Sequence, residues 1–174
     1  MNTTKKSSLL LFVGILSFSS CMSPLADLSN EDKATGKEVQ AKFDEYWKKL
    51  ENQDLSNIQD FYSESDKFRW TIGRGINSIQ TKNDFSNAND LEEFVQTNYG
   101  SNSLITMKMT CPKSVRVTDE SHARIFMTYK QSMQDLNGIK TNYQGHFMID
   151  MQKEEGEWKF LYGDDQRIQL SDDL

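Results

Sequence analysis

The chain has 174 residues, of which 26 are acidic and 20 are basic, and its formal net charge at pH 7 is −6. An acidic surface repels phosphate backbones and anionic lipid headgroups, so the composition argues against nucleic acid as a partner and against electrostatic binding to a membrane. The length suits one domain with a single hydrophobic core.

The N-terminal segment has the layout of a secretory signal. Two lysines precede a mainly apolar run, Leu9 to Phe18, and two serines then lead to Cys21. At about 1.5 Å per residue, a helix of this length covers about half of a ~30 Å hydrocarbon core, which indicates an export signal rather than a membrane anchor. Removal of residues 1–20 takes away two lysines and no acid, so the net charge moves from −6 to −8.

The residues around Cys21 resemble a bacterial lipoprotein box, in which the cysteine is lipidated and becomes the new N-terminus. Phe18 departs from the leucine that is usual three positions before the cysteine. The resemblance implies a signal peptide over 1–20, a tether over 21–35 that carries the lipid on Cys21, and an exported, membrane-anchored lipoprotein of the cell envelope. An ordinary signal with a chance cysteine is the alternative. Two acyl chains suffice for stable anchoring, since each buried methylene contributes about 0.8 kcal/mol.

The first half of the mature chain has the periodicity of amphipathic helices. One helix is predicted to begin at Thr35, a second, short one at Asp54, and a third over Asp90–Gly100, where the glycine marks the exit. A strand, Phe68–Ile72, in which apolar and polar residues alternate, lies between the second and third helices. The polar stretch between this strand and the third helix carries no predicted element.

The second half of the chain is predicted to form antiparallel strands joined by turns such as Asn137-Gly138. The strand-like runs are Leu104–Cys111, Ala123–Met133, Ile139–Met151 and Trp158–Gly163. The fold class is therefore α+β, with three N-terminal helices packed on one face of a strongly curved mixed or antiparallel sheet. The domain is predicted to span 36–168, before an acidic tail over 169–174, and the chain beyond Gly163 is expected to be loose. Cys111 is expected to be a buried, unreactive thiol.

The phase of the alternation predicts which strand residues face the helices. This inward set is rich in aromatic residues and methionines, which often enclose an apolar cavity with tyrosine hydroxyls as its few polar groups. The same residues would also serve as an ordinary core, and this alternative stays open. The pocket-lining candidates are Tyr46, Trp47, Phe61, Phe68, Trp70, Phe94, Met107, Met127, Tyr129, Phe147, Trp158 and Tyr162.

Several segments together resemble the nuclear-transport-factor-2-like superfamily, which includes the SnoaL-like proteins. They are the first helix, the segment Asp54–Asp66, the strand Phe68–Trp70 and the closing Gly156–Phe160 turn and strand. The resemblance covers about residues 36–168 and implies a cone-shaped, cystatin-like fold. Related cones often pair through the sheet, so it also implies a weak homodimer through the outer sheet face, where the apolar residues are Phe126, Met148 and Leu161.

Enzymes of that superfamily include isomerases, dehydratases, epoxide hydrolases and polyketide cyclases, and they place a carboxylate or a histidine inside the cone. In this chain Asp164 is the acid that continues the inward series of the last strand, where it could act as a general base. A solvated carboxylate at a strand end is the alternative. His146 is predicted to face outward, and His122 to lie at the start of a strand beside the polar residues Asp119, Glu120 and Ser121. No metal-ligand cluster and no phosphate-binding loop is evident, so no cofactor is expected.

Three functions stay open from the sequence. The first is a lipid-tethered domain that binds a small apolar or aromatic molecule. The second is an isomerase, dehydratase or cyclase with Asp164 as base and Tyr46 or Tyr129 polarising a carbonyl. The third is a purely structural or protein-interaction domain. We favour binding without catalysis.

Overall fold

The computed structural model describes residues 30–76 and 79–170, and all statements on structure refer to these residues. In chain order, the elements are α1 (Asn30–Glu51), the 3₁₀ helix η1 (Ile58–Phe61), β1 (Arg69–Ile76), β2 (Ile79–Phe85), α2 (Ala88–Gly100), β3 (Asn102–Met109), β4 (Ser114–Asp119), β5 (His122–Asp135), β6 (Lys140–Glu154) and β7 (Glu157–Leu170).

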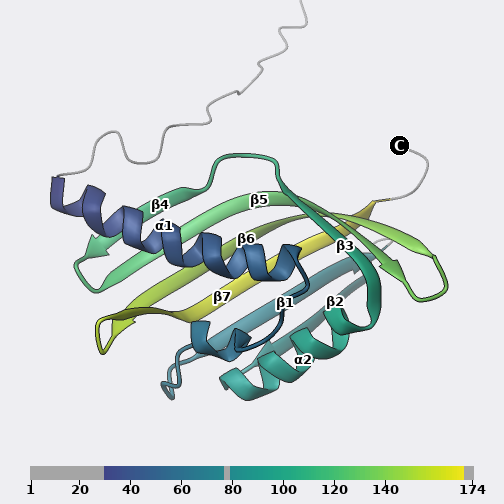
Figure 1. Ribbon diagram of the computed structural model, residues 1–174, viewed down its shortest axis with the longest axis horizontal. Helices are drawn as coiled ribbons and strands as arrows, with labels where there is room; N and C mark the ends of the chain where they lie inside the picture. Colours follow the sequence, from purple (N-terminus) through teal and green to yellow (C-terminus); the bar gives the residue numbers. More distant parts are fainter. Residues whose placement is uncertain (1–29, 77–78, 171–174) are drawn as a thin grey trace, which may run out of the picture.

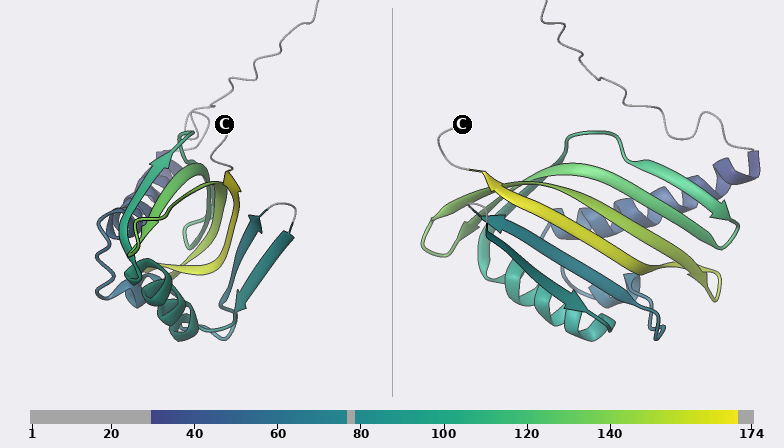
Figure 2. Two further views of the ribbon diagram at one scale, coloured as in Figure 1. Left: turned by 90° about the vertical axis from the view of Figure 1, so that its right-hand side faces the viewer. Right: turned by 180° about the vertical axis from the view of Figure 1, so that it is seen from behind.

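In the described part of the chain, seven strands form one curved sheet. The strand order is β2-β1-β7-β6-β5-β3, and β4 pairs with β5 beside β3. Strand β1 runs parallel to β7, and the other pairs are antiparallel. Figure 1 shows α1 lying across one face of the sheet, with α2 on the same face near β1 and β2. Figure 2 shows how strongly the sheet curves around this interior. The α+β class and the curved mixed sheet are confirmed.

The prediction of three N-terminal helices is wrong, because the described residues contain two α-helices and α2 follows the β1–β2 hairpin. The segment predicted to form the second helix makes only the four-residue η1. The Asp54 side chain accepts a hydrogen bond from the backbone N–H of Ser56 at 3.2 Å, which closes a turn, and Asn57 then has a left-handed backbone with φ 53°. These local bonds compete with helix formation.

Two strands were absent from the prediction because neither shows a clean alternation. The stretch 81–84 of β2 is exposed throughout, since β2 is an edge strand whose two faces both meet solvent. In β4 only Val115 is buried. Alternation marks a strand only where one face is covered, so strands of this kind escape a search for apolar periodicity.

The boundaries of the domain also differ from those predicted. Helix α1 begins at Asn30, so the last residues of the proposed tether are helical. Cys21 lies outside the described residues. At the other end, β7 continues to Leu170 instead of becoming loose after Gly163. Cys111 is exposed rather than buried, because β3 ends two residues before it, at Met109. Neither described helix is both long enough and apolar enough to span a bilayer.

A β-bulge divides β7 into two halves. Phe160 pairs with Met151 and Tyr162 pairs with Asp150, so consecutive residues of β6 face residues two apart on β7. Leu161 is therefore the extra residue of the bulge. An inserted residue moves every later side chain of a strand to the opposite face.

The bulge reverses which side chains of β7 face the helices. Beyond it, the buried residues are Gly163, Asp165 and Arg167. Tyr162 and Asp164 lie half-buried on the outer face. The prediction that these two side chains face the interior is therefore wrong, because the alternation was continued through the bulge. The acid that reaches the interior is Asp165.

Candidate functional site

The interior of the cone is almost filled by side chains. A cavity of about 20 Å³ remains, which is room for about one water molecule. Its walls are Tyr46, Trp47, Leu50, Trp70, Ile72, Val95, Tyr99, Met107, Tyr129, Phe147, Asp165 and Arg167.

The predicted pocket residues fall into three groups. Those at the cavity are Tyr46, Trp47, Trp70, Met107, Tyr129 and Phe147. Those buried elsewhere in the core are Phe61, Phe68, Met127 and Trp158. Phe94 is half-buried and packs on Phe85, with 5.1 Å between ring centroids, and Tyr162 is on the outer face.

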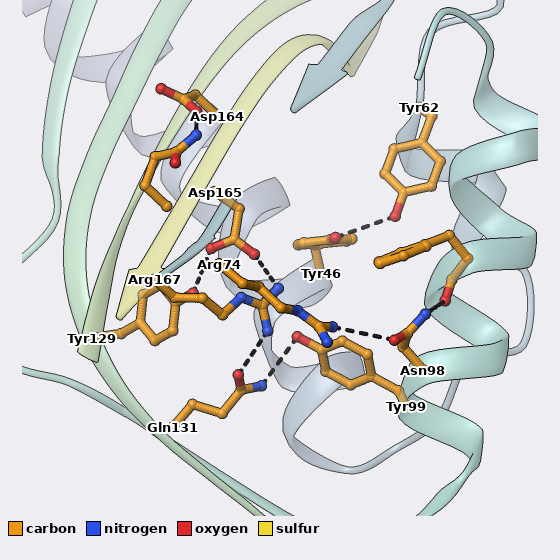
Figure 3. A network of polar contacts seen from close by, with 12 residues as sticks. Tyr46, Tyr62, Arg74, Asn98, Tyr99, Tyr129, Gln131, Asp164, Asp165 and Arg167 are labelled. Carbon is orange, nitrogen blue, oxygen red and sulfur yellow. Dashed lines mark hydrogen bonds and ion pairs between the residues drawn. The ribbon is translucent and has the colours of Figure 1, made fainter. Parts of the chain in front are cut away.

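A chain of polar side chains occupies one wall of this aromatic interior (Figure 3). Asp165 accepts hydrogen bonds from the Tyr129 hydroxyl and from Arg167 Nη2, the latter at 2.5 Å. Arg167 Nη1 donates to Gln131 Oε1 at 2.9 Å, and Gln131 Nε2 donates to the Tyr99 hydroxyl at 3.1 Å. We call these five residues the buried polar cluster. Gln131, Asp165 and Arg167 are each less than 5% exposed, at 2%, 4% and 3%, so the cluster is shielded from solvent.

The register of three strands brings the cluster together. Tyr129 of β5 pairs with Gly145 of β6, and Gly145 pairs with Arg167 of β7. A Cβ on Gly145 would lie 3.0 Å from both the Tyr129 ring and Arg167 Cβ, and 2.5 Å from the backbone oxygen of Gln166. The absence of a side chain at Gly145 therefore makes room for the tyrosine and the arginine to approach each other.

The charges in the cluster are fixed by their surroundings. Burial alone would lower the pKa of Arg167, but the adjacent Asp165 carboxylate outweighs it and the pKa is raised. Burial, with the Asp165 charge as the next cause, raises the pKa of Tyr129 well above its ordinary value. Tyr129 therefore stays a hydrogen-bond donor, and Arg167 stays a cation, at physiological pH.

A second guanidinium lies beside the cluster. Arg74 Nη2 donates to Asn98 Oδ1 at 3.2 Å, and the Arg74 guanidinium stacks over the Phe94 ring at 5.8 Å from its centroid. Burial lowers the pKa of Arg74, and the Arg167 charge lowers it further. Within the described residues, Arg74 makes no ion pair, and the Nε atoms of Arg74 and Arg167 are buried without a hydrogen-bond partner.

The tyrosines suggested for polarising a carbonyl already have partners. The Tyr46 and Tyr62 hydroxyls are 3.2 Å apart, and burial, followed by the proximity of Tyr62, raises the pKa of Tyr46 well above its ordinary value. The Tyr129 hydroxyl is bound to Asp165.

The remaining candidate groups lie away from the interior. Asp164 accepts a hydrogen bond from Gln166 Nε2 at 2.5 Å on the outer face. His146 belongs to the same face, where it packs near Phe126. His122 is exposed and lies 3.0 Å from an Asp119 carboxylate oxygen. No three His, Cys, Asp or Glu side chains of the described residues gather closely enough to hold a metal.

The outer face of the sheet contains a groove of about 660 Å³ that the sequence did not reveal. The Gln166 side chain lies where a Cβ of Gly73 would be, so the absence of a side chain at Gly73 lets Gln166 lie across β1 at this groove. Arg74 and Arg167 also border this groove. The lining of the groove also includes Thr81, Lys82, Thr128, Gln144, His146, Gln166, Ile168 and Leu170.

No protein-family model and no curated protein matches the chain. Solved structures do match it. A scytalone-dehydratase-like protein from Novosphingobium aromaticivorans gives a TM-score of 0.65 at 8% identity, over 80% of this chain and 88% of the other. A type 2 hexachlorocyclohexane dehydrochlorinase matches with a TM-score of 0.63 at 9% sequence identity, over 82% of this chain and 93% of the other. A nuclear-transport-factor-2-like superfamily protein from Salmonella enterica matches with a TM-score of 0.62 at 14% sequence identity, over 78% of this chain and 92% of the other.

Identities this low carry over the fold and nothing of the chemistry. The similarity extends over most of both chains in each comparison. The chain therefore has the α+β cone fold of nuclear-transport-factor-2-like proteins.

Proposed function

We propose that this protein is a lipid-anchored protein of the bacterial cell envelope whose cone binds a small, largely apolar or aromatic ligand at the buried polar cluster. The observation that carries the proposal is the cluster itself. Ion pairs that are buried in a core are often no more stabilising than apolar residues of the same volume. A chain of polar groups on the wall of an aromatic cavity is instead what ligand sites contain.

The cluster suits binding better than proton transfer. Both oxygens of Asp165 already accept hydrogen bonds, one from Tyr129 and one from Arg167. A general base must have a lone pair within reach of the proton that it removes. The two histidines of the chain, His122 and His146, both lie outside the interior. Asp165 therefore acts as a counter-ion that orients its neighbours.

Catalysis is the second candidate, and one observation favours it. The Tyr129–Asp165 pair borders the cavity, and proteins of this fold include a dehydrochlorinase. An isomerase, dehydratase or cyclase reaction would require the substrate to reach a remaining lone pair of Asp165 beside the bound Tyr129 and Arg167 groups. A purely structural domain is the third candidate, because the cavity holds only about one water in this state. Ligand entry therefore requires side chains such as Met107, which is flexible and lines the cavity, to move.

The test is to purify the protein from its own host without denaturation and to determine its crystal structure and native mass. We expect additional density beside Asp165 and Arg167, a wider cavity, and a bound mass that is released on unfolding. A closed cavity without bound mass in host-purified protein would support the structural domain instead.

Cys21 is expected to carry the membrane anchor. In host cells, Cys21→Ala should move the protein from the membrane fraction to a soluble fraction, because it removes the thiol that receives the acyl chains. The measurement is fractionation followed by immunoblotting. Cys111→Ala is the matched control, since it removes an exposed thiol within the folded domain. Retention of the Cys21→Ala protein in the membrane at the wild-type level would contradict lipidation.

The outer sheet face is expected to support a weak homodimer. Phe126 is 44% exposed there, and Met148 and Leu161 are half-buried on the same face. Sedimentation of a soluble form that begins at residue 22 should show association at high micromolar concentration, and Phe126→Glu should abolish it. A monomer at those concentrations would reject the dimer. Leu136→Glu, at another exposed apolar residue, is the control.

A further inference from the structure

We infer that the ligand of the cone carries a carboxylate, which binds between Arg74, Arg167 and the Tyr99 hydroxyl. This inference rests on the proposed function and names the chemical class that the site selects. Among the described residues, two guanidinium groups, one at the cavity wall and one beside it, stand against a single carboxylate, and their unpartnered N–H donors point to a missing oxyanion.

The described charged groups at and beside the cavity do not balance. Arg167 and Asp165 line the cavity, and Arg74, the register partner of Arg167, lies beside them and borders the outer groove, so two positive charges stand against one negative charge. A charge that is removed from water is costly unless an opposite charge compensates it. Among the described residues, Asn98 is the hydrogen-bond acceptor for the Arg74 guanidinium, and it is neutral. One further anion would balance the site.

In the part of the chain that the structure describes, two buried hydrogen-bond donors of these arginines lack acceptors. The Nε atoms of Arg74 and Arg167 are buried, and neither has a partner among the described residues. Guanidinium groups bind planar carboxylates through paired N–H donors. Buried N–H groups are nearly always satisfied in proteins, so two adjacent exceptions on neighbouring strands require an explanation. Residues 74 and 167 are direct register partners in β1 and β7.

The Tyr99 hydroxyl supplies a third donor. Gln131 uses its amide oxygen to accept from Arg167, so its amide nitrogen donates to Tyr99. Because the Tyr99 oxygen accepts this bond, its own proton remains to be donated. Tyr99 lines the cavity, as Arg167 does. Asp165, Arg167 and Gln131 thus form a series of hydrogen bonds that ends at the Tyr99 hydroxyl and leaves its proton available to donate (Figure 3).

Size limits how the ligand enters. The cavity of about 20 Å³ accommodates about one water, so an aromatic body must displace side chains. Small probes are therefore appropriate. Benzoate and benzamide have nearly the same shape and differ in charge, which separates binding to the apolar cavity from recognition of the anion.

The experiment is calorimetric titration of the mature chain, made soluble by Cys21→Ser, with benzoate and with benzamide. We expect benzoate to bind at least tenfold more tightly than benzamide. Arg74→Gln should abolish this preference while benzamide binding is kept. Arg69→Gln is the matched control, because Arg69 is an exposed arginine of the same strand, and it should leave both affinities unchanged.

The outcomes separate this inference from the proposed function. Equal affinity for the two probes would overturn carboxylate recognition and leave the binding cavity in place. Binding of neither probe would overturn the proposed function, and this inference with it. The urea midpoint of Arg74→Gln should not fall, because the substitution removes a like charge beside Arg167, whereas a purely structural arginine would lower it. Should that variant fail to fold, Tyr99→Phe is expected to weaken benzoate several-fold more than benzamide, and an equal effect on both would reject the inference.

Discussion

Replacing Asp165 by asparagine is expected to lower the free energy of unfolding by about 3–5 kcal/mol, which is typical when one partner of a buried ion pair is removed. The substitution keeps the shape of the side chain and leaves the Arg167 charge buried without its counter-ion. It also replaces one of the two acceptor oxygens of the residue, so either Tyr129 or Arg167 loses its partner. Urea denaturation measures the effect.

Asp164→Asn is the matched control for that prediction. Asp164 is the adjacent residue on the outer face, half-buried and bonded to the side chain of Gln166. A surface substitution of this kind should change stability by no more than about 0.5 kcal/mol. A larger loss for Asp164 than for Asp165 would contradict the reversal of side-chain phase by the bulge in β7.

Gly163→Ala is expected to destabilise the domain by about 1–3 kcal/mol or more, the usual cost of overpacking a filled core. An added Cβ would lie 2.2 Å from Trp70 Cε3 and 2.3 Å from Cδ2. The indole cannot easily move, because Trp70 is 2% exposed and packs edge-on against Tyr62 and Phe147. Thermal or urea unfolding of the variant measures the loss.

The control for this glycine lies at the end of α2. No atom lies within 4 Å of a Cβ added to Gly100. Gly100→Ala should therefore be neutral or stabilise by up to about 1 kcal/mol through the higher helix propensity of alanine. Equal destabilisation by both substitutions would show that the contact with Trp70 is not the cause.

The sequence was informative where strands are long, regular and covered on one face. In β5 and β6 the predicted inward residues, such as Met127, Tyr129 and Phe147, are buried as expected. The pairing of these two strands runs from His122 to Gln134 without a register shift. An unbroken register preserves the two-residue period, which is the property that the prediction used.

The polar part of the candidate site was missed for the same reason that the aromatic part was found. The prediction continued the two-residue alternation through β7. The bulge at Leu161 shifts this alternation by one residue, so Asp165 faces the interior and Asp164 faces outward. A local sequence contains little that marks a bulge. The available signal was Gly163, Asp165 and Arg167 at two-residue spacing, which places a small residue and an opposite-charge pair on one face of a strand.

The parallel pairing of β1 with β7 has a consequence for how the protein is made. The last strand, β7, lies in the middle of the sheet between β1 and β6. Its pairing with β1 joins residues that are far apart in the sequence, such as Arg69 and Tyr162. The β1–β2 hairpin cannot join the other strands until β7 has been synthesised. Contacts this far apart in sequence slow folding, because a long loop must close first. The sheet therefore stays incomplete during synthesis until β7 has left the ribosome.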